Sequence, residues 1–161
     1  MREYFEAKHG ELPNWRTMLH LFQADRELLL QQKILPALQE GKHIVSDRCW
    51  LSTLVYQATS AQHEGEDHDK VASHIISMNA HVRSPDLTIL LEIPFEVALE
   101  RRRSRAVTAV TEDHFERRRK FMQDVHKAYQ RADGRGILRI DANRPMEEVE
   151  NDVFSAASAL L

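Results

Sequence analysis

The stretch PDLTILLEIP, residues 85–94, decides the fold class of this chain. It is a run of leucine and β-branched residues between two prolines, which predicts a strand. GILRIDA (residues 136–142) and HIVS (residues 43–46) indicate two further strands, and HIVS is short and continuous enough to be buried on both faces. Helical patterns separate the three. We therefore predict an α/β fold in three layers, a parallel sheet with helices on both faces.

The predicted helices begin with an amphipathic segment that ends near Gly41. Asn14 is placed to cap its first turn, and Pro36 either kinks this helix or starts a new one. Gly41 is a suitable C-terminal stop. Further helices are predicted after Arg48, over residues 67–83, from Pro94, from Asp113 to Arg131, and from Pro145.

Length and composition exclude several classes of protein. With 161 residues the chain fits one domain, residues 1–161. Its net charge of −3 gives no global basic field for nucleic acid or membranes, and its single cysteine excludes an internal disulfide. No apolar run reaches the roughly 20 residues that span a bilayer. We expect a cytoplasmic protein.

Charged residues follow directly after two predicted strands. Asp47 and Arg48 come after HIVS, and Asp141 ends the last strand before Ala142 and Asn143. Ligands of open parallel sheets bind beyond the carboxyl ends of the strands, so these residues are candidates for a binding site. Two structural alternatives stay open for the first pair: a helix cap formed by Asp47, or a buried ion pair.

Further arginines lie in unusual places. Arg26 comes four residues after Phe22, on the apolar stripe of its helix, where it either snorkels or faces a planar or anionic ligand. Arg101, Arg103 and Arg105 alternate near a predicted helix end. They form either a solvated face or a clamp for phosphate groups.

Two common site motifs are absent from the sequence. The nine histidines include no His-x-x-x-His pair with a partner carboxylate, which argues against a histidine metal site. The five glycines include no Gly-x-x-x-x-Gly-Lys-Ser/Thr loop, whose backbone amides would cradle phosphates.

Several segments together resemble one family. LFQADR, PALQEGK, SDRCWLSTLVYQA, PDLTILLEIPFEVALERRRSR, DHFE and RIDANRPMEEV occur in the order of the thymidylate kinase motifs. The resemblance extends from about Arg2 to Val149. It implies a P-loop kinase fold and transfer of the γ-phosphate of ATP to dTMP.

The resemblance also implies roles on the acceptor side. Phe22 would stack on thymine, and Arg26 would hydrogen-bond the base or the monophosphate. Arg48 would hold the acceptor phosphate. The base edge and the deoxyribose would be contacted by Thr53, Gln57 and Tyr56.

On the donor side, the family implies ATP and Mg²⁺. Asp47 would organise the magnesium ion, and with Arg48 it would serve catalysis. The lid over the ATP phosphates would contain Arg101, Arg103 and Arg105, of which Arg103 and Arg105 would be catalytic. The loop bordering adenine would contain Ala142, Asn143 and Arg144. A homodimer is expected, with no nucleic-acid or membrane partner.

The sequence departs from the family mainly by lacking the P-loop. The corresponding strand is central in the family's sheet, so we expect a central and an edge strand to be missing and the domain to be N-terminally incomplete. One hypothesis is a dTMP kinase whose given chain is inactive alone. The alternative is a non-catalytic descendant that binds nucleotide or a partner. A nucleic-acid surface formed by the arginine runs is the weakest reading, because the net charge is −3.

Overall fold

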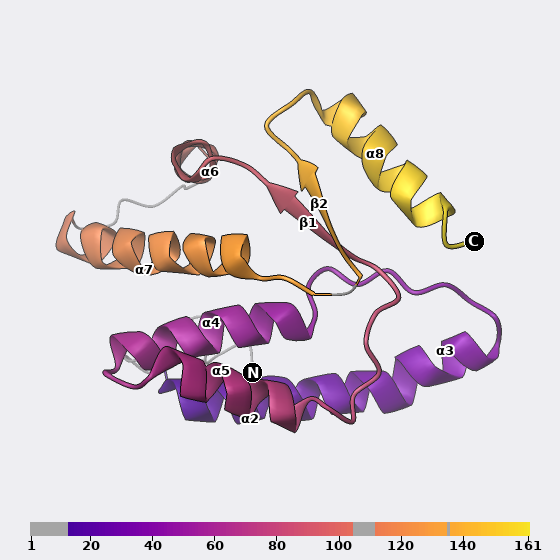
Figure 1. The fold of residues 1–161 in the computed structure, drawn as a ribbon, viewed down its shortest axis with the longest axis horizontal. Coiled ribbons are helices and arrows are strands. Elements are labelled where there is room, and N and C mark those ends of the chain that lie inside the picture. Colours follow the sequence, from indigo (N-terminus) through magenta and orange to yellow (C-terminus); the bar gives the residue numbers. More distant parts are fainter. Residues whose placement is uncertain (1–12, 105–111, 135) are drawn as a thin grey trace. The chain divides into compact units, whose positions relative to one another are not determined.

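The structure is a computed structural model that describes residues 13–104, 112–134 and 136–161, without the side chains of 103 and 112–118. The chain divides into two compact units, one up to Val82 and one from Arg83 onward. Figure 1 shows the first unit in indigo to magenta and the second in rose to yellow.

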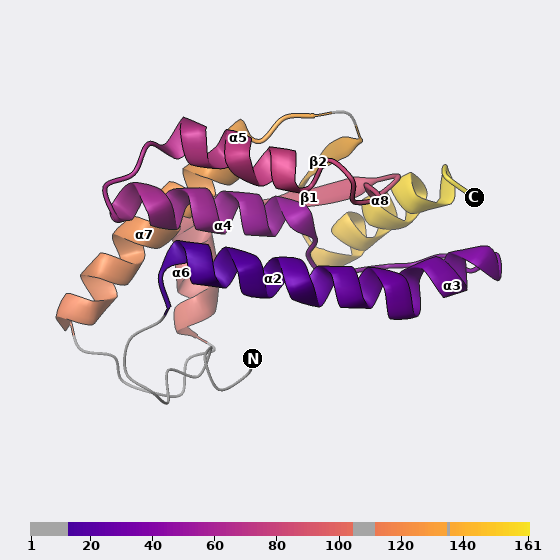
Figure 2. The same cartoon turned by 90° about the horizontal axis from the view of Figure 1, so that it is seen from below.

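The first unit is helical in its described part. Figure 2 shows α2 continuing through a π-helical segment into α3 as one long rod, with α4 alongside α2 and α5 alongside α4. The elements are α2 (Trp15–Leu29), η1 (Leu30–Ile34), α3 (Leu35–Gln39), α4 (Trp50–His63) and α5 (His68–Met78).

The core of the first unit lies where α4 meets both of its neighbours. Leu19 of α2 is 1% exposed and Ile75 of α5 is 0% exposed. Between them α4 contributes two alanines, whose small side chains let the helix axes approach closely. The core cluster comprises Trp15, Leu19, Ala58, Ala61, Val71 and Ile75.

The ends of the long rod confirm the predicted signals. The Asn14 side chain accepts a hydrogen bond from the Thr17 N–H at 3.0 Å, so Asn14 is the N-cap. Gly41 has a φ of 75°, a conformation that favours glycine, and follows the last turn. Pro36 lies in the first turn of α3, just after the π-helical segment. A proline cannot donate to the preceding turn, and the wider π turn accommodates this loss.

The prediction of a strand over HIVS is wrong. Residues 43–46 form no strand, and Val45 is 99% exposed rather than buried. A strand needs hydrogen bonds to a neighbouring backbone, and the described residues of the first unit contain no other strand. The apolar character of the segment is therefore real, but it has no partner to pack or pair with there.

The second unit contains the two other predicted strands, β1 (Thr88–Glu92) and β2 (Ile137–Asp141). They pair in parallel, with Thr88 opposite Ile137 and Glu92 opposite Asp141 (Figure 1). Because they are parallel, the carboxyl ends of both strands lie at the same edge. The helices are α6 (Phe95–Arg103), α7 (Glu112–Arg131) and α8 (Met146–Ser158).

Side chains tie the helices of the second unit to each other and to the sheet. Phe95 of α6 contacts the His126 ring of α7 with 5.7 Å between ring centroids. Arg139 of β2 pairs with Glu92 of β1. It also donates to the carbonyl of Tyr129 at 3.2 Å, within the last turn of α7. A guanidinium at this position satisfies carbonyls that the helix leaves unpaired.

The sheet confirms the parallel α/β prediction only in part. Among the described residues it contains two strands rather than three. The α8 helix packs against β2 (Figure 1). Leu91 and Leu138 are 53% and 40% exposed, so the predicted burial on both faces is not reached along the strands.

Candidate functional site

The first unit brings Arg26 of α2 and Thr53 of α4 together. Arg26 Nη2 donates to Thr53 Oγ1 at 2.7 Å. Arg26 Nη1 donates to the side-chain oxygen of Asn79, the residue that follows α5. One guanidinium thus joins three helices at the end of the bundle opposite Trp15.

Burial sets the electrostatic state of this arginine. The Arg26 side chain is half-buried, and the loss of hydration lowers its pKa. The negative charge of a Cys49 thiolate acts in the opposite direction and raises the pKa of Arg26. An arginine remains protonated even so. The site therefore holds a partly desolvated positive charge, which strengthens its attraction for an anionic or acceptor-rich ligand.

The segment before α4 presents Asp47 and Arg48. Both are exposed, so the buried ion-pair alternative is wrong. The N-cap of α4 is Cys49, without a side-chain cap bond, so Asp47 is not the helix cap either. Arg48 has a φ of 74°, unusual for a residue with a Cβ, and its carbonyl accepts from Ser46 Oγ at 2.8 Å.

The Arg48 side chain turns toward α4. Its Cζ lies 5.6 Å from the centroid of the Tyr56 ring, within cation–π range. Since Thr53 and Tyr56 are three residues apart on α4, Arg26 and Arg48 contact neighbouring positions of one helix. Four of the predicted acceptor residues therefore form two adjacent contacts, Arg26 with Thr53 and Arg48 with Tyr56.

The other predicted acceptor residues lie on the same helices. Gln57 is 5% exposed on α4, one turn beyond Thr53, which is 6% exposed. Phe22 is half-buried on α2, one turn before Arg26. Polar side chains this well buried need hydrogen-bonding partners, as Thr53 has in Arg26.

The predicted lid lies only partly within the described residues. Arg101 is exposed in the last turns of α6, beside a shallow hollow that Ile93, Ala98 and Arg102 also line. The Arg103 side chain and the whole of Arg105 lie outside the described residues.

The loop after β2 has a defined conformation. The Ala142 N–H donates to the Glu92 carbonyl and the Asn143 N–H to Asp141 Oδ1, both at 2.8 Å. Arg144 pairs with Asp152 of α8, and this hydrogen bond raises its pKa. Its Nε also donates to the carbonyl of Asp141 at 3.0 Å, and the flat face of the guanidinium still permits stacking.

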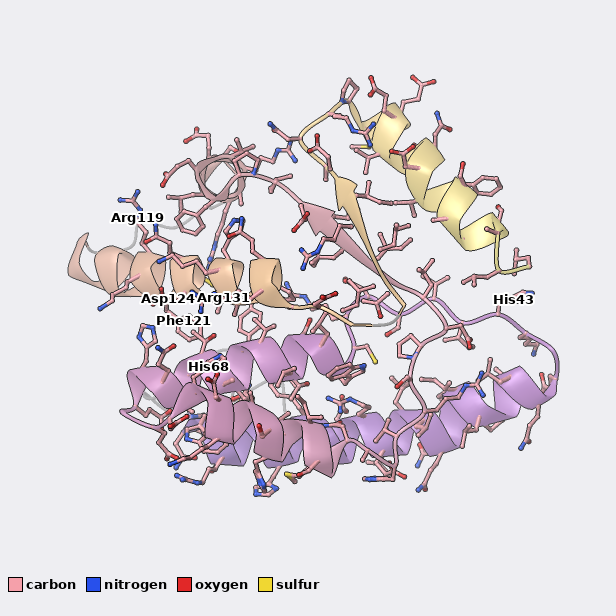
Figure 3. All side chains as sticks on the ribbon, viewed as in Figure 1. His43, His68, Arg119, Phe121, Asp124 and Arg131 are labelled. Atoms are coloured by element: carbon pink, nitrogen blue, oxygen red, sulfur yellow. The ribbon has the colours of Figure 1, made fainter. Side chains whose placement is uncertain are left out.

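The described residues contain neither a cluster of metal-binding side chains nor a membrane-spanning helix. No group of three His, Cys, Asp or Glu side chains among them could hold a metal ion. Figure 3 labels His43 in the segment after α3 and His68 at the start of α5, on different elements. The other labelled side chains, Arg119, Phe121, Asp124 and Arg131, all belong to α7. No helix in these ranges is long and apolar enough to cross a membrane.

Asn79 is the one member of this cluster that the sequence did not point to. The sequence predicts a helix over residues 67–83 that includes Asn79, whereas α5 ends at Met78 and Asn79 is its C-cap. The available signal was the asparagine itself, a residue enriched at helix ends. Nothing in its spacing indicated a contact with Arg26, 53 residues earlier.

The sequence segments that form these contacts match a known family. A sequence model of the family described as thymidylate kinase matches residues 1–153. The chain belongs to the thymidylate kinase family. This match confirms the family resemblance seen in the motifs.

Individual relatives agree with the family match. The chain is 35% identical over 144 residues to a probable thymidylate kinase of Archaeoglobus fulgidus, covering 89% of this chain and 67% of the relative. It is 33% identical over 143 residues to a thymidylate kinase of Legionella pneumophila, covering 87% and 64%. For a thymidylate kinase of Dinoroseobacter shibae the identity is 36% over 152 residues, covering 91% and 70%. The chain thus spans about two thirds of the length of these relatives.

Proposed function

We propose that this protein is a dTMP kinase and that its first unit binds the acceptor nucleotide. The observation that carries the proposal is the half-buried Arg26, held by Thr53 and Asn79 in a chain of this family. A fixed guanidinium suits recognition of a planar base or a phosphate.

The acceptor would be bound from three sides. Phe22 stacks on thymine, Arg26 bonds the base or monophosphate, and Arg48 holds the acceptor phosphate. The base edge meets Thr53 and Gln57, while Tyr56 packs on the deoxyribose and disfavours a 2′-hydroxyl. The cation–π contact between Arg48 and Tyr56 supports this arrangement, because it joins the phosphate and sugar contacts.

The reaction requires little covalent chemistry from the protein. An oxygen of the dTMP phosphate attacks the γ-phosphorus of ATP, the bond to the β–γ bridging oxygen breaks, and ADP leaves with that electron pair. Catalysis then consists of positioning and neutralising charge. Arg48 would neutralise the acceptor, and the lid residues Arg101, Arg103 and Arg105 would neutralise the donor.

The residues fit a magnesium ion carried by a nucleotide. Mg²⁺ is usually bound by one or two carboxylates together with phosphates and water, so the single exposed carboxylate of Asp47 suffices. The ion would supply charge neutralisation at the phosphates. Asp47 would orient it beside Arg48.

The donor nucleotide fits in part. The ordered loop of Ala142, Asn143 and Arg144 offers backbone and a guanidinium face beside adenine. The 161 residues include no Gly-x-x-x-x-Gly-Lys loop for the β- and γ-phosphates. We therefore propose that this chain alone transfers phosphate poorly. A homodimer and a cytoplasmic location complete the proposal.

The same lack of a phosphate-binding glycine loop favours one alternative, a protein that binds nucleotide or a partner without catalysis. Titration calorimetry with dTMP and with ATP, together with a coupled assay for ADP, distinguishes the two. Measurable turnover that depends on dTMP and Mg²⁺ supports the kinase. Binding of dTMP without ATP binding or turnover supports the alternative, and absence of dTMP binding contradicts the acceptor site proposed for the first unit.

Cys49 provides a direct test of acceptor binding. It is the only cysteine, is half-buried, and lies next to Arg48 in the sequence. A thiol reagent should modify it more slowly with dTMP present, by about tenfold at a dTMP concentration ten times its dissociation constant. The rate is followed by absorbance of the released thiol dye. Equal protection by AMP would indicate a non-selective anion site, and no protection by dTMP would contradict acceptor binding here.

A further inference from the structure

We infer that Asn79 is a positioning residue for nucleotide recognition, which it serves by fixing the guanidinium of Arg26. The inference rests on the proposed function, in which Arg26 contacts dTMP. It adds the end of α5 to a site otherwise formed by α2, α4 and the segment before α4.

The guanidinium is held at two points on different helices. Nη1 donates to Asn79 Oδ1, and Nη2 donates to Thr53 Oγ1 at 2.7 Å. Two bonds from different nitrogens fix both the position and the plane of the group. A guanidinium has five N–H donors, so at most three remain for a ligand.

Asn79 is itself held in one orientation. Its Nδ2 donates to the carbonyl of Ile75 at 2.6 Å, one turn back in α5. A carbonyl can only accept and a guanidinium can only donate, so the amide oxygen must face Arg26. Ile75 is 0% exposed in the core, so the hydrogen bonds from Ile75 through Asn79 to Arg26 begin at the most buried part of α5.

Fixing Arg26 before the ligand arrives lowers the cost of binding. A free arginine side chain samples many rotamers, and fixing it in one of them when a ligand binds costs free energy. A contact that already fixes the side chain before binding removes this cost. Thr53 alone would leave the group free to rotate about a single bond. The Asn79 contact removes this freedom.

A purely structural role at the helix end is the competing explanation, and Ser77 provides its matched control. Ser77 Oγ donates to the His74 carbonyl at 2.7 Å, at the same end of α5, and has no contact with Arg26 among the described interactions. Ser77→Ala therefore removes a helix-end hydrogen bond without affecting the guanidinium.

The first measurement is dTMP affinity by titration calorimetry on the full chain. Asn79→Ala should weaken binding about tenfold, the size expected for a hydrogen bond to a charged group. Ser77→Ala should bind dTMP nearly as the wild type does. In the Arg26→Lys background, Asn79→Ala should have little additional effect. Equal losses for Asn79→Ala and Ser77→Ala would overturn the inference.

The second measurement needs no ligand. NMR signals of the Arg26 Nη protons should be resolved at low temperature in the wild type and in Ser77→Ala, and averaged by rotation in Asn79→Ala. Unchanged signals in Asn79→Ala overturn the positioning role, whatever the affinity. If the wild type does not bind dTMP while the signals behave as expected, the proposed function fails and the contact with Arg26 stands.

Discussion

Replacing Arg48 by alanine or glycine should lower dTMP affinity about 100-fold, the scale of a lost charge-assisted contact to phosphate. The two variants should differ in stability. Arg48 has a φ of 74°, which costs an L-residue about 1 kcal/mol and costs glycine almost nothing. Both variants lose the contact with Tyr56, so the difference between them isolates the backbone term. We expect Arg48→Gly to be the more stable by about 1 kcal/mol.

Urea denaturation gives the stability difference and calorimetry gives the affinity. Arg16→Ala is the matched control, because Arg16 is an exposed arginine of the same unit that pairs with Glu66 at the other end of α2. It should leave dTMP affinity unchanged. If Arg16→Ala weakens dTMP binding as much as the Arg48 variants do, the loss reflects overall charge rather than the contact proposed for Arg48.

Such a strained arginine is typical of a functional position. Backbone conformations that disfavour a side chain persist where the surroundings require them, often at ligand sites. Ser46 Oγ bonds to the Arg48 carbonyl and supports this turn. We propose that an arginine is retained at this strained position because its side chain binds the acceptor phosphate.

Much of the local structure could be predicted because the signals are local. Asn14 caps α2, Gly41 follows the end of α3, and both apolar strands of the second unit form where expected. Each of these depends on a few consecutive residues. Pro36 was ambiguous, and the structure accommodates it through a π-helical turn, which the proline alone does not predict.

What the sequence analysis missed depends on which segments contact each other in the fold, and not on the local preference of a segment for helix or strand. Residues 43–46 are apolar enough for a strand, yet pairing depends on another backbone that no property of these four residues supplies. The same holds for the site. The helix period placed Arg26 on the core-facing stripe, but Asn79 could not be assigned to it, because that contact depends on how α2, α4 and α5 pack.

Truncating Ile75 to alanine should cost about 3 kcal/mol of unfolding free energy, because a fully buried side chain loses its contacts and leaves a cavity. Ile75 is 0% exposed, whereas its neighbour Ile76 is 51% exposed. Ile76→Ala makes the same chemical change at the next residue and should cost no more than about 0.5 kcal/mol. Helix propensity changes equally in both variants, so the difference reports burial alone.

The comparison also tests how the core of the first unit supports the site. A domain is stable by only about 5–15 kcal/mol, so losing 3 kcal/mol is large but leaves a folded chain. Ile75→Ala keeps the carbonyl that receives Asn79 Nδ2, and dTMP affinity should therefore fall much less than in Asn79→Ala. Urea midpoints and calorimetry on both variants measure this. Equal stability costs for the two isoleucines would mean that α5 is not packed against α4 as the structure has it.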